Sequence, residues 1–520
     1  MALNILAVTS EAFPLAKTGG LGDAVSGLAQ SLTNCGAAVT LLLPMYRGVQ
    51  SHLDRIKEVA QLDDLPGGNA ALMAGHCPEL NLPVLLLEND ALYNREGIYV
   101  APDGQEYPDN ALRFAALAHA AARIARGNLL MARPDIVHAH DWHAALTPLL
   151  MHQAGIKNVK TILTLHNIAF QGVFPMELAA QLGIDERYCT DAGAEFWGKL
   201  SFLKAGIRFA DVVTVVSGNY AREILTPKFG CGLQGLLAQR GSDLISIANG
   251  IDTKLWNPHC DPYLHGHQFD SHRLKNKTLC KRDLQQAFGL AEDAGATIMA
   301  MGSRLTTQKM ADIAIDAIPR ALDTYPSLQM CVMGRGDKSL EASLRTMAQR
   351  YPGRCGVHIG FDEPRAHLLH AGADILLHGS RFEPFGLTPL YSMRYGTIPI
   401  GSKVGGMVDT ITDPGPQREI SAMRGASGIL FEGETADAMV QAIARAMTLR
   451  EHPDIWLAMQ KNGMGADFSW AKTAPAYMSL YRSLVPGPTR FEARPARPAR
   501  HPIRLPKRAP ASVMATQPGT

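Results

Sequence analysis

Residues 17–23, KTGGLGD, place a lysine and three glycines between an apolar run and an amphipathic stretch. Glycine accepts positive φ and lets a ligand approach the backbone closely, and a helix that begins here has unpaired N–H groups. Lys17 adds a positive charge to the same turn. The segment therefore predicts a phosphate site, although its spacing is neither that of GxGxxG nor that of a Walker loop. A tight turn without a ligand is the alternative.

A pair of cations follows an apolar run in the second half of the chain. MGSRLTTQK places Arg304 and Lys309 five residues apart. Two cations suit a diphosphate, because each can pair with a different phosphoryl group. A solvated loop is the simpler interpretation of this segment taken alone.

A carboxylate precedes a further glycine in RFEPFGLTP, where Glu383 lies before Gly386, Leu387 and Thr388. The last three residues open a predicted helix, whose free N–H groups could bind phosphates while the carboxylate holds a polar ligand. The alternative is an acid that only stabilises the helix dipole.

Histidines gather in the first half in HAHDWH, residues 138–143, and His166 and Asn167 follow the next apolar run. A zinc hydrolase usually carries its acid directly before the third histidine, whereas here Trp142 lies between Asp141 and that histidine. Alternation along a strand places His138 and His140 on one face. We expect a polar cluster at a cleft edge rather than a metal site.

Short apolar runs must position these residues, and they alternate with amphipathic stretches that are typical of βα units. A helix from Asp23 to about Asn34 is expected after the first run. Two doubly wound parallel sheets are predicted, joined between Asn249 and Glu292, with ligands at the carboxyl ends of the strands. The predicted strands are residues 5–10, 38–44, 83–89, 135–140, 160–167, 211–217, 296–304, 328–336, 356–361, 373–380 and 396–402.

Composition narrows the class of protein. A chain of 520 residues exceeds one hydrophobic core, and 46% hydrophobic with 19% charged residues is ordinary for a globular protein. A net charge of +2 gives no reason to expect nucleic acid or membrane partners. Eight cysteines without a CxxC pair indicate reduced thiols. The first residues do not show the charged and apolar pattern of a leader segment, and no apolar run reaches membrane-spanning length, so we expect a cytoplasmic protein.

The composition changes at Gly487. Residues 487–520 contain seven prolines and seven Lys or Arg against one Glu. Such a segment cannot bury enough apolar surface to order itself, so we expect a disordered basic tail. Docking of the tail on a polyanion or a partner is the alternative.

The motifs, taken together, resemble those of bacterial glycogen synthases and the related plant starch synthases. The resemblance runs from about residue 3 to 484 and leaves out only the tail. Its motifs are KTGGLGD, HAHDWH, TLHNIAFQG, FLKAGIRFADVVTVVS, IANGID, SRLTTQK, RFEPFGLTPLYSMRYG and the closing DFSW.

This resemblance implies a glycosyltransferase B fold, an α/β architecture in which two Rossmann-like domains with parallel sheets face each other across a deep cleft. The implied divisions are an acceptor-side domain at 1–255, a nucleotide-sugar domain at 256–470, a helix at 471–486 that crosses back, and the tail. The implied reaction transfers glucose from ADP-glucose to the non-reducing end of an α-1,4-glucan such as glycogen. Configuration is retained, and neither cofactor nor metal is needed. A UDP-glucose-preferring synthase and a non-catalytic glucan-binding homologue are the alternatives.

The resemblance also implies roles for the candidate residues. Arg304 and Lys309 would pair with the diphosphate, and Glu383 would hold the hydroxyls of the transferred glucose. His166, Asp141 and Asn249 would surround that glucose, with Asn167 beside them. The remaining donor contacts would come from Lys17, Gly19 and Gly20, from the N–H groups of Gly386, Leu387 and Thr388, and from Phe361 stacked on adenine.

Four departures from the family pattern lie near these residues. Met310 stands where a glycine is usual, and Phe385 replaces a cysteine. His378-Gly379 replaces Met-Pro, and Pro389 replaces a glutamine. Since Phe385 adjoins the predicted donor site, we expect an effect on donor affinity or nucleotide preference. The charged and hydrogen-bonding residues of the motifs are retained.

Overall fold

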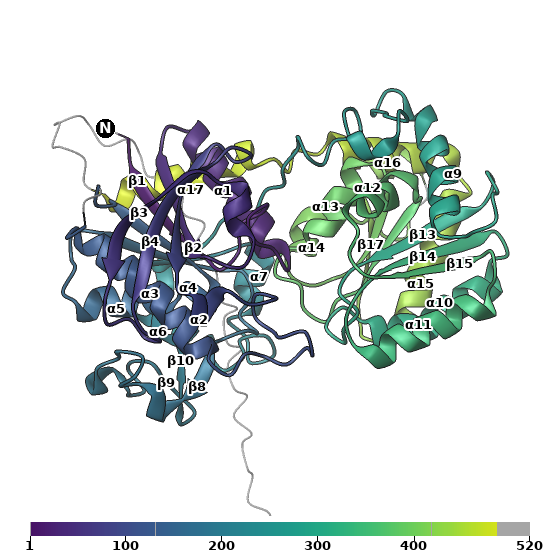
Figure 1. Cartoon of the computed structure of the whole chain (residues 1–520). Helices are drawn as coiled ribbons and strands as arrows, with labels where there is room; N and C mark the ends of the chain where they lie inside the picture. The colour runs from purple at the N-terminus through teal and green to yellow at the C-terminus, as the bar shows by residue number, and fades with distance from the viewer. Residues whose placement is uncertain (1, 130–131, 418, 486–520) are drawn as a thin grey trace, which may run out of the picture.

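Two lobes, each built around one large β-sheet, make up the chain in a computed structural model that describes residues 2–129, 132–417 and 419–485 (Figure 1). The predicted disordered tail at 487–520 lies outside the described residues. Within these residues, no helix combines the length and apolar character that crossing a bilayer requires.

The first lobe contains a nine-stranded sheet that is parallel except at β3 and β4. The six strands predicted for this half form its centre, because each is a short apolar run that is buried on both faces. The edge strand β3 was not predicted, since its exposed face carries charged residues in the pattern DRIKEVAQL. The strand order is β12 (Leu244–Ser246), β11 (Val212–Val215), β7 (Lys160–Leu165), β6 (Ile136–His140), β1 (Asn4–Val8), β2 (Ala38–Pro44), β5 (Leu82–Glu88), β4 (Ala70–Cys77) and β3 (Asp54–Leu62).

Helices cover this sheet, and the first of them bears on function. The helix α1 begins at Gly20, three residues before the predicted start, so the glycine turn is itself the helix N-terminus. The alanine-rich α3 is almost wholly buried. The helices of this lobe are α1 (Gly20–Asn34), α2 (Asp90–Tyr93), α3 (Asn110–Arg126), α4 (Asp141–Ala144), α5 (Leu146–Gln153), α6 (Phe202–Phe209), α7 (Gly218–Glu223) and α8 (Gln234–Arg240).

The second lobe contains a six-stranded, entirely parallel sheet. The strand order is β15 (Cys355–Ile359), β14 (Leu328–Gly334), β13 (Thr297–Gly302), β16 (Ile375–His378), β17 (Ile398–Ser402) and β18 (Ile429–Phe431). Its helices are α9 (Lys277–Ala287), α10 (Ala311–Thr324), α11 (Lys338–Arg350), α12 (Glu363–Gly372), α13 (Leu387–Arg394), α14 (Gly406–Thr410), α15 (Ala436–Arg450) and α16 (Pro453–Gly465). The predicted class, two Rossmann-like domains with parallel sheets, is confirmed by these two lobes.

A small antiparallel sheet attached to the first lobe was not predicted (Figure 1). It consists of β8 (Val173–Pro175), β10 (Lys199–Ser201) and β9 (Glu195–Phe196). Strands of two or three residues are too short to show a hydrophobic period, so pattern analysis does not detect them.

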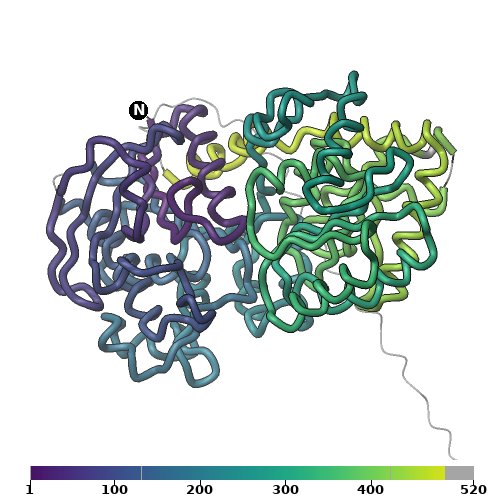
Figure 2. Tube along the Cα trace, turned by 45° about the vertical axis from the view of Figure 1, so that its right-hand side comes forward, coloured from purple at the N-terminus to yellow at the C-terminus, as the bar shows by residue number. Residues whose placement is uncertain are grey.

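The last helix, α17 (Trp470–Leu484), runs back to the first lobe, where it packs against α1 (Figure 2). Gly27 of α1 makes this approach possible, because a Cβ there would lie 2.1 Å from Trp470 Nε1. Tyr481 then forms a 2.8 Å hydrogen bond to His138 Nδ1 of β6. The helix lies where a crossing helix was predicted, whereas the domain boundaries at 255 and 470 stay predictions.

A second contact joins the lobes through α7 and α14, each of which caps the N-terminus of the other with a carboxylate. The Glu223 carboxylate accepts hydrogen bonds from Gly405 N at 2.9 and 3.1 Å. In return, Asp409 Oδ2 accepts from Asn219 N at 2.8 Å. Each short helix thus receives its capping carboxylate from the opposite lobe, which fixes the lobes relative to each other.

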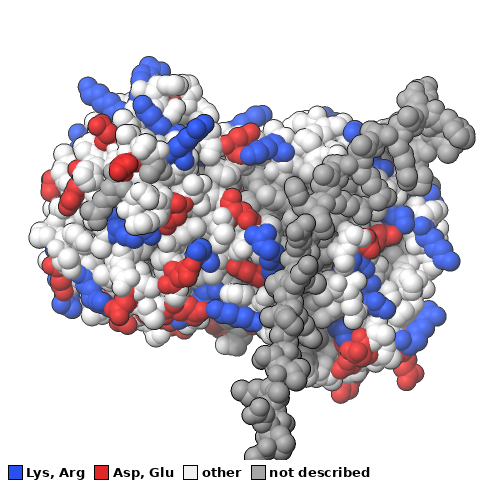
Figure 3. All heavy atoms as spheres, turned by 180° about the vertical axis from the view of Figure 1, so that it is seen from behind, with Lys and Arg blue, Asp and Glu red and all other residues white. Residues whose placement is uncertain are grey.

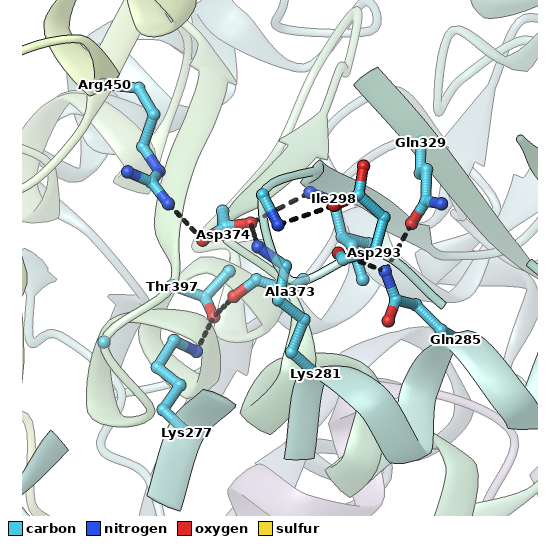
Figure 4. Close-up of polar contacts among 12 residues, drawn as sticks. Lys277, Lys281, Gln285, Asp293, Ile298, Gln329, Ala373, Asp374, Thr397 and Arg450 are labelled. Carbon is cyan, nitrogen blue, oxygen red and sulfur yellow. Dashed lines mark hydrogen bonds and ion pairs between the residues drawn. The ribbon is translucent and has the colours of Figure 1, made fainter. Parts of the chain in front are cut away.

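Buried polar groups tie α9 to the amino ends of strands in the second lobe (Figure 4). Lys277 Nζ donates to Ala371 O and to Thr397 Oγ1, both at 2.8 Å. Lys281 Nζ lies 2.8 Å from Asp374 Oδ2, which also accepts from Ile298 N. These contacts lie at the end of the sheet opposite the predicted site, so we assign them to stability.

We expect Lys277→Met to change how the free energy of unfolding depends on pH. Burial lowers the pKa of Lys277 to about 7. Between pH 7 and about 10.4 the unfolded chain therefore holds a proton that the folded chain lacks, so rising pH favours folding of the wild type. Urea denaturation should show the wild type gaining about 1–2 kcal/mol on the variant from pH 7 to 9. Lys275→Met, at an exposed neighbour, is the control. A difference in the free energy of unfolding between wild type and variant that stays constant from pH 7 to 9 would contradict the expectation.

Candidate active site

A buried carboxylate that sequence analysis missed, Glu11, organises the glycine-rich turn. Its oxygens accept from Thr18 N at 2.7 Å, Thr18 Oγ1 at 2.8 Å and Gly19 N at 3.1 Å, and Tyr99 donates to it at 2.6 Å. The N–H of Gly19 is therefore occupied, and the free N–H groups of the turn belong to the start of α1, at Gly20 and the residue after it. No local motif marked Glu11, because its partners become neighbours only when the turn folds back.

The N-terminus of α1 meets the N-terminus of α13 from the opposite lobe. A Cβ on Gly20 would lie only 3.0 Å from Leu387 Cδ1. Gly386 precedes α13 with a φ of +87°, a left-handed conformation that favours glycine. Pro389 has no N–H, so Leu387 and Thr388 carry the free N–H groups of α13. Two positive helix ends thus converge on one region, which favours an anion there.

Lys17 lies at the same boundary. Its Nζ is 2.9 Å from Asp23 Oδ1 and 5.9 Å from the centre of the Phe361 ring. Phe361 follows β15 in the second lobe and is 71% exposed, so its ring face is available to a ligand. Burial raises the pKa of Asp23, and the charge of Lys17 opposes this effect.

Glu383 is a buried carboxylate whose donors all reach one oxygen. Its Oε2 accepts from Lys309 Nζ, from His378 Nε2 at 3.1 Å and from Ser380 Oγ at 3.0 Å. Burial alone would raise the pKa of Glu383, but Lys309 and His378 lower it well below its usual range. Among the described residues no donor reaches Oε1. The charged carboxylate therefore has an oxygen left for a ligand.

Arg304 is exposed at the mouth of the same loop. Its Nη2 donates to Gln308 Oε1 at 3.2 Å, and Gln308 in turn donates to Phe382 O at 3.2 Å. No carboxylate of the described residues lies within ion-pair distance of Arg304. The structure thus places Lys309 against Glu383 and holds Arg304 beside that pair, with its charge free for a ligand.

Asp141 holds together the residues that follow β6 and β7. Its Oδ1 accepts from His166 N at 2.7 Å and from Asn167 N at 3.1 Å. The residue has a φ of +54°, a left-handed conformation that asparagine and aspartate tolerate better than other side chains. Burial raises the pKa of Asp141 to about 7. Burial also lowers the pKa of His166 to about 3, so this imidazole is neutral.

The histidines of HAHDWH serve separate purposes. His138 and His140 share a face of β6 as predicted, with ring centres 4.1 Å apart. His138 bonds Thr164 and Tyr481, whereas His140 Nδ1 lies 3.1 Å from His166 Nε2. His143 stacks on an aromatic ring of the first lobe. Across the described parts of the chain, no three His, Cys, Asp or Glu side chains form a metal-ligand group.

Asn249 is the predicted site residue with the fewest ties to the others. It is buried in the loop after β12, and its N–H donates to Val216 O at 3.3 Å. No hydrogen bond among the described residues links Asn249 to Asp141, His166 or Glu383.

The departures at Met310 and Gly379 explain each other. Met310 has a φ of +52°, the conformation for which glycine is usual. Its side chain fills the space beside Gly379, where a Cβ would lie 3.2 Å from Met310 Cβ. The Met310 side chain therefore leaves room only for a glycine at position 379. Together with the His378–Glu383 contact, these substitutions surround the Lys309–Glu383 pair without removing it.

Two known protein families together match most of the chain. The family described as Starch synthase catalytic domain matches residues 4–239, and Glycosyl transferases group 1 matches residues 284–462. A glycogen synthase of Bordetella bronchiseptica is 58% identical over 492 residues, covering 94% of this chain and 96% of that protein. A glycogen synthase of Ralstonia nicotianae is 49% identical, covering 96% and 93%.

Solved structures agree with this match. The catalytic domain of Starch Synthase IV from Arabidopsis thaliana, bound to ADP and acarbose, has a TM-score of 0.83 at 27% identity. The alignment covers 93% of this chain and all of that domain. A sucrose-phosphate synthase from Thermosynechococcus elongatus, with a TM-score of 0.59 and 19% identity, shares the fold.

We expect Asp141→Asn to stabilise the protein in a pH-dependent way. An asparagine oxygen can still accept from both amides, and it carries no buried charge. Because folding raises the pKa of Asp141 to about 7, the wild type loses stability as pH rises from about 4 to 7. The advantage of the variant should grow by about 1–3 kcal/mol from pH 5 to pH 8 in chemical denaturation. Asp316→Asn, on an exposed face of α10, is the control. An advantage that does not change with pH would count against the buried charge.

Proposed function

Because the chain belongs to the glycogen synthase family of glycosyltransferases, we propose that it transfers glucose from ADP-glucose to an α-1,4-glucan with retention of configuration. The non-reducing end of a glycogen chain is the acceptor. The observation that carries this proposal is the convergence of α1 and α13 from opposite lobes, where Gly20 approaches Leu387. Because helix N-termini favour anions, we place the pyrophosphate of the donor at these two helix ends.

Cations beside these helix ends support a diphosphate leaving group. Lys17 lies on the first lobe, and Arg304 and Lys309 lie on the second. As the bond between sugar and phosphate breaks, negative charge builds up on the departing ADP. Contacts that strengthen with this charge lower the barrier, since only interactions stronger in the transition state accelerate the reaction.

The exposed ring of Phe361 supports adenine as the base of the proposed donor. An open face of the ring would stack on a purine, and Lys17 Nζ lies over the ring, 5.9 Å from its centre. The related starch synthase domain bound to ADP supports an adenine nucleotide. UDP-glucose is the alternative donor.

The transferred glucose would lie between Glu383 and the Asp141–His166 cluster. Glu383 Oε1 is available to accept from sugar hydroxyls. Asp141 does not suit the role of a nucleophile, because its Oδ1 is engaged by two backbone N–H groups. We therefore assign front-face attack, in which the departing phosphate takes the proton of the acceptor hydroxyl. Neutral His166 and Asn167 would orient the sugar, and closure of the lobes would exclude water.

Nucleotide release from ADP-glucose and from UDP-glucose, each with glycogen, tests the proposal. We expect release of ADP that depends on glycogen, with slower turnover of UDP-glucose. Faster turnover of UDP-glucose would overturn the donor assignment alone. A protein that binds glycogen but turns over neither donor would be a non-catalytic homologue and would contradict the proposal.

Single substitutions test the assigned residues. Lys17→Ala, Arg304→Ala and Glu383→Ala should each lower kcat about 10²–10³-fold, by analogy with removal of one transition-state contact. Circular dichroism should show an unchanged fold. Arg320→Ala, at an exposed arginine paired with Asp437 on the far helices of the second lobe, is the matched control. Near-normal rates for all three variants would reject this site.

A further inference from the structure

The small sheet of the first lobe and the loop before it bear three exposed apolar side chains. Trp197 is 81% exposed, Phe170 is 47% exposed and Val173 is 40% exposed. On the face of the molecule opposite to that of Figure 1, acidic and basic side chains are interspersed (Figure 3). A tryptophan held so far out of the protein makes little contact with its own chain, which points to an external partner.

The hairpin between β9 and β10 holds Trp197 in place. Trp197 has a φ of +55°, a strained conformation for a bulky residue. Glu195 Oε1 accepts from Gly198 N at 2.6 Å and closes the turn. The nearly buried Lys204 donates to Glu195 O at 2.5 Å and to Asp191 Oδ1 at 2.9 Å. Strain maintained by such support is typical of a functional position.

A depression of about 390 Å³ lies beside this hairpin. Its size falls within the roughly 300–1,000 Å³ of small-ligand sites. Indole and phenyl rings form one part of the lining, and an exposed carboxylate, an amide and two glycines form another. The residues used in the argument are Asp191, Phe196, Trp197, Gly232, Gly235 and Gln239.

Contacts connect this depression to the loop that carries His166. Gln171, five residues after His166, donates from Nε2 to Cys231 O at 2.8 Å. The next residue, Gly232, approaches Trp197 so closely that a Cβ there would lie 3.3 Å from Trp197 Nε1. Below them, Trp142, the neighbour of Asp141, packs against Gly172. These contacts tie the Trp197 hairpin to the loop that carries His166.

We propose that this hairpin surface, built on Trp197, Asp191 and Gln239, binds outer glucose units of the glucan whose end lies in the active site. An α-glucan presents apolar sugar faces edged by hydroxyl groups. The exposed indole can take such a face, while the Asp191 carboxylate and the Gln239 amide take hydroxyls. The inference rests on the proposed function, because the acceptor of that reaction is the occupant.

Binding at two places on one polymer raises avidity for long chains over short ones. We therefore expect Trp197→Ala to raise the KM for glycogen by about tenfold, while kcat with maltose stays within about twofold of the wild type. Trp197→Phe, which keeps an aromatic ring, should restore much of the affinity for glycogen. Leu457→Ala on α16, a substitution at a 37% exposed apolar side chain, is the matched control.

Electrophoresis in gels that contain glycogen, with no donor present, measures binding separately from transfer. Loss of retardation in Trp197→Ala, with activity on maltose retained, would support the inference. Unchanged retardation, or an equal loss of activity with glycogen and with maltose, would overturn it. If the wild type transfers no glucose yet its retardation depends on Trp197, the proposed function fails while the glucan site stands.

Discussion

Two helix N-termini from opposite lobes point their free N–H groups at one region, and the arrangement of this molecule depends on that convergence. Without a ligand, the positive ends of α1 and α13 and the charge of Lys17 repel each other. The contact between Gly20 and Leu387 therefore needs support from elsewhere. That support comes from α17, which returns to the first lobe, and from the reciprocal capping of α7 and α14.

Charge compensation in the candidate site is uneven. Lys309 and Glu383 neutralise each other within the protein, whereas Arg304 has no carboxylate partner among the described residues. Lys309 is thus paired within the second lobe, whereas Arg304 is available to an incoming anion. Glu383 gathers its three donors on one oxygen, which leaves the other oxygen for a sugar. This arrangement suits a nucleotide sugar better than an isolated phosphate.

Some of the residues nearest the proposed chemistry have features that lower the stability of the folded protein. Asp141 carries a buried carboxylate in a left-handed conformation, and burial raises its pKa. Met310, the neighbour of Lys309, also has a positive φ. Strained positions of this kind persist when the surrounding structure determines them, and they concentrate at functional sites. The buried apolar strands β6 and β13, which precede Asp141 and Met310 in the chain, supply the rigidity that these positions need.

The apolar runs and the glycine turns were enough to predict two βα sheets, and motif order was enough to predict the family, because both depend on local periods and spacing. Lys17, His166, Arg304 and Glu383 were predicted as site residues in the same way, since each follows a strand whose carboxyl end brings it to one edge of a sheet. Only the tertiary structure decided that Glu11 holds the glycine turn, that His378 and Ser380 share an oxygen of Glu383, and that Gly20 meets Leu387. Those contacts join residues from 3 to 367 positions apart in sequence, with no common local pattern. The small sheet around Trp197 escaped prediction for a related reason: strands this short are set by the surface on which they pack and not by their own sequence.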